Sequence, residues 1–237
     1  MKQRGVHLNN KQKNQLRKVV SAGPKGGKRG LLKWLIALVL IIAGGSGVGS
    51  LFNQESVSSP PTVTETQTEV DNAIQRFNGT NFEILPQMVK IPVEYERVVD
   101  GDTQIVSLNN HSLRVRHLMI DTPESVKEGT SVQPFGKESS QRNDQLLSQA
   151  KTLYLMLDVG PATDQYDRVL AYLYADDILV AEQLLEEGLA SVRYVNPPNN
   201  TYEDEFRAAQ SKAKKAELNI WSINNYVESN GYFNQVD

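Results

Sequence analysis

Four short polar segments constrain this chain more than any other part of its sequence. They are Val99–Thr103 (V-D-G-D-T), Arg114–Glu124 (R-V-R-H-L-M-I-D-T-P-E), Thr163–Arg168 (T-D-Q-Y-D-R) and Tyr194–Asn200 (Y-V-N-P-P-N-N). Each segment alone predicts only a bend or the start of a helix. Together they offer carboxylates that can bind a hard cation and arginines that can grip a phosphate. That combination is typical of metal-assisted phosphodiester cleavage.

The sequence around these segments predicts a small α+β domain. Alternating apolar and polar residues predict strands, and the expected strands are Val89–Val99, Gln104–Leu108, Ser112–Ile120, Thr152–Leu157 and Val169–Tyr174. Asn109-Asn110 favours a hairpin turn between two of them. The expected helices are Lys137–Lys151, Ala181–Glu187 and Tyr202–Glu217, the last with Thr201 as its N-cap. Five strands with three interspersed helices suggest a small closed barrel.

In their order and spacing, the four segments resemble those of the thermonuclease (staphylococcal nuclease-like) family. The likeness runs from about Val89 to Trp221 and ends in L-N-I-W after a lysine-rich helix. It implies a five-stranded OB-fold barrel and a Ca²⁺-dependent extracellular endonuclease of low sequence specificity. Such an enzyme hydrolyses DNA, and RNA as well, leaves 3′-phosphate ends, and is expected to act as a monomer without a protein partner.

A different class of function stays open beside this one. Some domains of this fold are non-catalytic modules that bind nucleic acid or protein, and these have lost the acidic and arginine residues of the site. This chain keeps all five charged positions, which are Asp102, Arg116, Asp121, Glu124 and Arg168. We therefore favour the enzyme.

The resemblance assigns a metal-binding role to one group of residues. Asp102 and Asp121 would bind Ca²⁺ with the backbone carbonyl of Thr122, because hard cations prefer oxygen ligands. Glu124 would act as the general base or orient the attacking water. Read without the resemblance, Asp102 forms a turn, and Asp121 and Glu124 belong to a helix start, where carboxylates are favoured.

Two arginines and two tyrosines would complete the substrate side. Arg116 and Arg168 correspond to the phosphate-gripping arginines of the family, and bidentate guanidinium contacts suit a phosphate. Tyr166 and Tyr194 match tyrosines that line the nucleotide pocket. Otherwise, Arg116 is a surface residue of a strand, Arg168 pairs with an aspartate of its own segment, and the tyrosines are half-buried at the barrel rim.

The chain departs from the family pattern on the substrate side. Gln165 stands where the best-known members carry a lysine, Asn196 replaces a second pocket tyrosine, and Asp167 replaces a glycine. These changes make the substrate side more negative or less able to stack on bases, so we expect the chemistry to survive and substrate binding to weaken. The chain has no Cys and only three His without paired spacing, which gives no sign of a zinc site.

The charge is divided unequally along the 237 residues. The formal net charge is −3, but residues 1–33 carry ten Lys and Arg and no acidic residue. The other 15 basic and 28 acidic residues give the remainder a net charge of −13. A basic disordered arm could bind DNA, but the apolar residues that follow it make membrane orientation the better interpretation.

The sequence therefore predicts five regions. They are a basic cytoplasmic head (1–33), a transmembrane signal anchor (34–52), a flexible linker rich in Ser, Thr and Pro (53–75), the OB-fold domain (76–222) and a C-terminal tail (223–237). The predicted location is the cell membrane, single-pass, with the catalytic domain outside. Secretion after signal-peptide cleavage is the alternative, although no clean A-x-A site follows Ala43.

Overall fold

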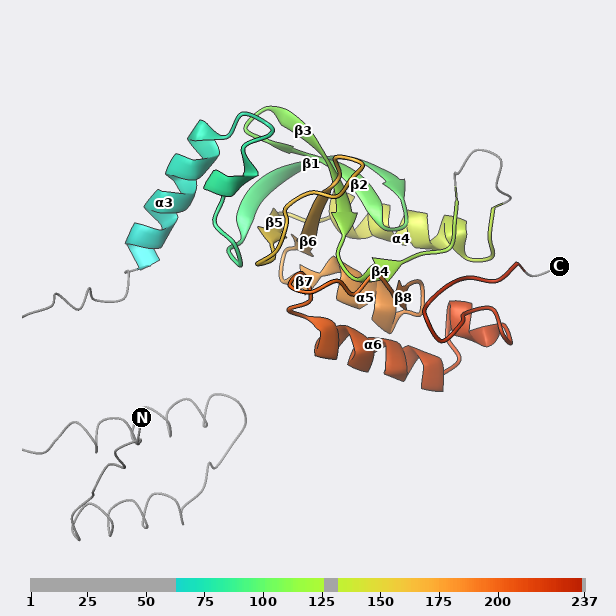
Figure 1. Ribbon diagram of the computed structural model, residues 1–237. Helices are drawn as coiled ribbons and strands as arrows, with labels where there is room; N and C mark the ends of the chain where they lie inside the picture. Colours follow the sequence, from blue (N-terminus) through green and yellow to red (C-terminus); the bar gives the residue numbers. More distant parts are fainter. Residues whose placement is uncertain (1–62, 126–131, 236–237) are drawn as a thin grey trace, which may run out of the picture. The chain divides into compact units, whose positions relative to one another are not determined.

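The computed structural model describes residues 63–125 and 132–235 (Figure 1). The predicted head, the predicted transmembrane anchor and the first part of the predicted linker lie outside the described residues. Among the helices of the described part, none is long and apolar enough to cross a bilayer.

The described residues form a closed barrel of five principal strands. These are β1 (Ile91–Asp100), β2 (Thr103–Leu108), β3 (His111–His117), β5 (Leu153–Leu157) and β6 (Val169–Ala175). β1 pairs antiparallel with β2 and β5, β2 pairs with β3, and β5 pairs with β6. A parallel pairing between β3 and β6 closes the barrel. The five-stranded barrel expected from the sequence is therefore confirmed.

Short strands extend the barrel where the site segments lie. β4 (Ile120–Asp121) pairs antiparallel with β8 (Ser191–Val192), and β7 (Ile178–Leu179) pairs with β6. The expected strand Ser112–Ile120 is interrupted, because Met119 has a φ of 59° and separates β3 from β4. This break turns the chain so that the site residues after β3 do not continue along the barrel wall.

Three helices lie close to their expected positions, and a fourth was not expected. α4 (Gly136–Ser148), α5 (Val180–Glu186) and α6 (Glu203–Lys215) match the predictions within a few residues (Figure 1). The fourth, α3 (Val63–Arg76), contradicts the prediction of a flexible linker for residues 63–75. Val70 and Ala73 of this helix are buried together with Phe77, so these residues belong to the folded domain and not to a tether.

The predicted N-cap of the last helix is wrong for a specific reason. α6 begins at Glu203 with Tyr202 at its cap position. The Thr201 hydroxyl instead donates to Asp158 Oδ1 at 2.5 Å. The Asp158 side chain therefore links the end of β5 to the start of α6 through hydrogen bonds.

Asp158 gathers several donors in the domain interior. Asp158 is 2% exposed. Its carboxylate accepts hydrogen bonds from the Tyr172 hydroxyl (2.6 Å) and from the backbone N–H groups of Val159 (2.8 Å) and Thr201 (3.1 Å). Burial raises the pKa of Asp158, but the donors outweigh burial and hold that pKa below its usual value. The ionised carboxylate is therefore the form that stabilises the fold.

We expect Asp158→Ala to lower the free energy of unfolding by on the order of 3 kcal/mol, because three residues lose a buried charged acceptor. The contribution of Asp158 to the free energy of unfolding should be fully present above the pKa of this carboxyl in the unfolded state, near 4. It should disappear as pH falls through the lower pKa of Asp158 in the folded state. Urea unfolding at pH 7 and pH 3 measures both effects. Asp177→Ala, at an exposed aspartate in the β6–β7 turn, is the matched control; equal losses in the two variants would contradict the prediction.

The residues after Trp221 pack on the domain. Tyr226 and Phe233 are buried and form a small apolar cluster with Ile220. The Tyr226 hydroxyl donates to the carbonyl of Pro134 at 2.8 Å. The C-terminal tail, predicted to lie outside the domain, is thus in contact with it as far as the structure describes it.

Candidate functional site

A groove with a volume of about 960 Å³ brings the four polar segments together. Its lining comes from the β1–β2 turn, from β3 and β4, and from the loops around β6 and β8. All eight residues that the sequence singled out line it, namely Asp102, Arg116, Asp121, Thr122, Glu124, Tyr166, Arg168 and Tyr194. Sequence segments up to about a hundred residues apart thus meet on one surface.

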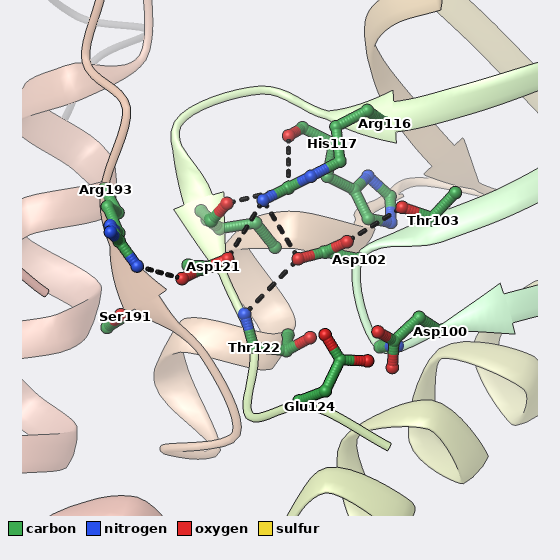
Figure 2. Close-up of polar contacts among 12 residues, drawn as sticks. Asp100, Asp102, Thr103, Arg116, His117, Asp121, Thr122, Glu124, Ser191 and Arg193 are labelled. Atoms are coloured by element: carbon green, nitrogen blue, oxygen red, sulfur yellow. Dashed lines mark hydrogen bonds and ion pairs between the residues drawn. The ribbon is translucent and has the colours of Figure 1, made fainter. Parts of the chain in front are cut away.

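Asp102 is held in the turn between β1 and β2. It is 7% exposed, its Oδ1 accepts from the Thr103 hydroxyl at 2.9 Å, and its Oδ2 lies 3.4 Å from the backbone N–H of Thr122 (Figure 2). The glycine before it is required by the close approach of the next segment. A Cβ at Gly101 would lie 2.5 Å from Thr122 Oγ1. The V-D-G-D-T sequence therefore sets Asp102 against the Asp121-Thr122 segment.

Arg116 lies between the two aspartates that were predicted to bind a metal. Its Nη2 is 3.0 Å from Asp102 Oδ2 and 3.1 Å from Asp121 Oδ1, and its Nη1 donates to the carbonyls of His117 and Ile120 (Figure 2). Arg116 is 7% exposed, so the alternative interpretation of Arg116 as a surface residue of the strand is wrong. In this arrangement Arg116 offsets part of the carboxylate charge and links the two aspartates.

Asp121 has a second arginine partner that the sequence analysis missed. Arg193 Nη1 lies 2.7 Å from Asp121 Oδ2 (Figure 2). Arg193 follows β8, and the pairing of β8 with β4 brings it beside Asp121. The signal in the sequence was weak, because Arg193 stands immediately before the motif residue Tyr194 and matches nothing in the predicted pattern.

Burial makes the negative charge at the site costly. It raises the pKa of Asp121 to about 6; the neighbouring charge of Asp102 adds to the rise and Arg116 opposes it. Burial also raises the pKa of Asp100 to about 6, although the Ser125 hydroxyl donates to Asp100 at 2.6 Å and opposes the rise. The arginines therefore leave the carboxylate charge incompletely compensated.

Glu124 is fixed at its backbone by the segment before α4. Its N–H donates to Gln133 Oε1 at 2.7 Å, and its carbonyl accepts from the Gln133 N–H at 2.9 Å. α4 begins directly against it, since a Cβ at Gly136 would lie 2.5 Å from the Glu124 carbonyl oxygen. Figure 2 shows the Glu124 side chain directed to the same region as Asp100 and Thr122.

Arg168 reaches the groove from the loop before β6. Its Nε and Nη2 lie 2.8 Å and 2.7 Å from Asp164 Oδ2, so the expected pairing with an aspartate of its own segment is present. The guanidinium carbon is also 5.6 Å from the centre of the Tyr166 ring. Arg168 is thus preorganised, and both it and Tyr166 line the groove.

The two tyrosines are open to solvent. Tyr166 is 67% exposed, which is more than the alternative of a half-buried rim residue implies, whereas Tyr194, at 52% exposed, still fits that alternative. Exposed aromatic rings beside arginines can stack on bases. Of the three departures from the family pattern, Gln165 and Asn196 line the groove. Asp167 adopts a φ of 58°, a conformation that glycine takes freely and aspartate tolerates.

His117, which directly follows Arg116, is a buried residue of the barrel. It is 1% exposed, its Nε2 is 3.4 Å from Asn143 Oδ1, and burial lowers its pKa to about 4. It is therefore neutral at pH 7 and adds no positive charge to the site.

The donors at the centre of the site fit a hard divalent cation. The buried carboxylate of Asp102 and the half-buried carboxylate of Asp121 both contact Arg116 Nη2, and the Thr122 hydroxyl oxygen is buried without a hydrogen-bond partner. All of these are oxygen donors, which suit Ca²⁺ and Mg²⁺. Within residues 63–125 and 132–235, no three His, Cys, Asp or Glu side chains converge on a single metal position. A cation here would rely on Asp102 and Asp121, a backbone carbonyl and water.

Comparisons with known proteins place the chain in a family. Residues 114–223 match the family described as "Staphylococcal nuclease homologue". Endonuclease YncB of Bacillus subtilis (strain 168) is 38% identical over 201 residues, which cover 84% of this chain and 94% of that protein. The chain belongs to the staphylococcal nuclease family. It is therefore a phosphodiester-hydrolysing nuclease, as the resemblance in the sequence predicted.

Two further relatives of this nuclease agree with the assignment. Thermonuclease of Staphylococcus intermedius is 40% identical over 126 residues, covering 53% of this chain and 73% of that protein. The SPbeta prophage-derived endonuclease YokF of Bacillus subtilis (strain 168) is 46% identical over 142 residues, which cover 60% of this chain and 48% of that protein. The similarity to both falls short of the full chain.

Proposed function

We propose that this nuclease is a Ca²⁺-dependent endonuclease that cleaves DNA, and RNA as well, with low sequence specificity and leaves 3′-phosphate ends. The observation that carries the proposal is the groove in which Asp102, Asp121 and Glu124 lie with Arg116 and Arg168. Family resemblance supports the choice of Ca²⁺ and of the 3′-phosphate product. The open groove and the exposed tyrosines suit a flexible polyanion better than a small enclosed substrate.

Each charged side chain has a chemical task in this proposal. Glu124 accepts a proton from the water that attacks phosphorus in line with the leaving 5′-oxygen. Arg168 and Arg116 donate to phosphate oxygens as negative charge develops there. Asp102, Asp121 and the Thr122 carbonyl would hold the cation, which supplies electrostatic stabilisation of the phosphate charge.

Plasmid degradation by the full-length chain tests the proposed activity. We expect cleavage with Ca²⁺, less with Mg²⁺, and none with EDTA. The new 5′-hydroxyl ends should accept phosphate from a polynucleotide kinase directly, and the new 3′-phosphate ends should fail to prime a polymerase until a phosphatase has acted on them. Cleavage in EDTA would contradict metal dependence. Binding of plasmid without cleavage in any of these conditions would favour the non-catalytic module.

We also propose that the nuclease domain stands outside the cell on an uncleaved membrane anchor. The support is the run of ten basic residues before the apolar segment 34–52, because basic residues remain on the cytoplasmic side. Protease added to intact cells should remove the catalytic domain and leave the basic head. Recovery of most of the protein from the medium, with a new N-terminus between about residues 43 and 53, would instead support signal-peptide cleavage.

A further inference from the structure

Arg193 lies beside the proposed cation site but has no task in the chemistry above. It contacts Asp121 Oδ2 at 2.7 Å, while Arg116 contacts Asp121 Oδ1 at 3.1 Å. Each carboxylate oxygen of Asp121 therefore faces one guanidinium group. Arg193 is outside the set of residues that line the groove, so it acts on the site through Asp121 and not on the substrate directly.

The guanidinium of Arg193 is also flanked by two aromatic rings. Its central carbon lies 4.5 Å from the centre of the Tyr194 ring and 4.8 Å from the centre of the Tyr232 ring. Contacts of this length between a guanidinium and a tyrosine are attractive. Tyr194 belongs to the site, whereas Tyr232 comes from the end of the chain.

The packing of the C-terminal segment (residues 226–233) places Tyr232 beside Arg193. The Ser191 hydroxyl donates to the Gly231 carbonyl at 2.7 Å. The approach is so close that a Cβ at Gly231 would lie 2.5 Å from the Val192 carbonyl oxygen and 3.2 Å from Arg193 Cβ. Buried Tyr226 and Phe233 anchor the two sides of this turn. The position of Arg193 thus depends on a segment distant in sequence from the site.

We propose that Arg193 competes with the divalent cation for Asp121, and that Tyr232 keeps Arg193 in the competing position. The proposal rests on the proposed function, in which Asp121 binds the cation. A guanidinium and a metal ion seek the same carboxylate oxygen, and a positive charge beside the site lowers cation affinity. Because Arg116 still contacts Asp121 Oδ1, loss of Arg193 does not release the carboxylate. The C-terminal segment thereby raises the cation concentration at which the nuclease becomes loaded.

A purely supporting role for Arg193 predicts the opposite result. If Arg193 only orients Asp121, its removal disorders the carboxylate and weakens cation binding. If Arg193 competes, its removal strengthens binding. The sign of the change therefore separates the two roles, and it can be read without nucleic acid or turnover.

Calorimetric titration of the full-length chain with CaCl₂, without nucleic acid, measures whether Ca²⁺ affinity rises or falls when Arg193 is removed. Arg193→Gln should bind Ca²⁺ about ten-fold more tightly than the wild type, and Arg193→Lys, which keeps the charge, should stay within about two-fold. Tyr232→Ala should bind about three-fold more tightly because the ring no longer holds the guanidinium, while Tyr232→Phe keeps the ring and the wild-type affinity. Arg207→Gln removes the same charge from the exposed face of α6 and is the matched control.

Thermal unfolding supplies a second readout. Metal-free Arg193→Gln should melt lower than the wild type, because Asp121 loses a partner, and should gain more in melting temperature from added Ca²⁺. Unchanged or weaker Ca²⁺ affinity in Arg193→Gln overturns the competition and leaves the proposed function intact. Absence of Ca²⁺ binding by the wild type overturns both. If Arg193→Gln does not fold, the variants at the exposed position 232 test the competition. The proposal then requires that Tyr232→Ala bind Ca²⁺ more tightly than Tyr232→Phe does.

Discussion

Glu124→Gln should reduce the turnover of this nuclease by on the order of 10² to 10⁴, because an amide cannot accept a proton from the attacking water. The substitution keeps the size of the side chain. The contacts that fix residue 124 are made by its backbone, through Gln133, so they remain in the variant. Initial rates of plasmid cleavage at saturating Ca²⁺ measure the loss.

Stability and cation binding are the controls for this variant. Its melting temperature should stay within a few degrees of the wild type, and its calorimetric Ca²⁺ affinity should change little, because the proposed ligands are Asp102 and Asp121. Glu138→Gln, on the first turn of α4, makes the same chemical change outside the residues that line the groove and should leave turnover unchanged. Wild-type turnover in Glu124→Gln would exclude Glu124 as the base.

Much of the fold was predictable because the strands have clear local signals. The five principal strands follow period-two alternation or apolar runs, and Asn109 and Asn110 have the positive φ angles that a tight hairpin needs. The closure of the barrel was harder to predict from the sequence. It depends on the parallel pairing of β3 with β6 across about fifty residues, and nothing local to either strand specifies that partner.

The two errors at the ends of the domain have different causes. α3 was missed because Ser, Thr and Pro dominate the segment before it, although Val70, Ala73, Ile74 and Phe77 have the spacing of one helix face. The C-terminal segment has no such period. Its buried Tyr226 and Phe233 lie in irregular structure, so their burial follows from the shape of the surface they cover.

The composition of the site was predictable but its internal pairing was not. Motif order was sufficient to name eight residues that line one groove. Motif order could not reveal that Arg116 is buried between Asp102 and Asp121, because alternation along a strand does not say whether Arg116 lies on the buried or the exposed face of the sheet. Arg193 was missed because its role comes from the β4–β8 pairing, a long-range contact.

The two arginines that we propose to bind phosphate have different surroundings, so the same substitution should have different effects at the two positions. Arg168→Lys should lower turnover by about 10²-fold, since an ammonium group cannot offer the planar fork to a phosphate. Its effect on stability should be small, within about 1 kcal/mol, because the Arg168–Asp164 pair is partly exposed. Arg116→Lys should lower turnover at least as much and also cost on the order of 3 kcal/mol of stability.

The stability cost at position 116 follows from the number of buried partners. Arg116 contacts two carboxylates and two backbone carbonyls at once, and a lysine ammonium cannot reach all four. Removing these contacts leaves the buried carboxylate of Asp102 and the half-buried carboxylate of Asp121 to repel each other. Ca²⁺ should therefore restore more melting temperature to Arg116→Lys than to Arg168→Lys, because the cation would replace the missing charge between them. Arg142→Lys, at an ion-paired arginine outside the groove, controls for the substitution itself. Unaltered turnover in both groove variants would exclude the proposed contacts of these arginines with the phosphate. Equal stability of the two variants would mean that the buried contacts of Arg116 do not stabilise the fold more than the Arg168–Asp164 pair does.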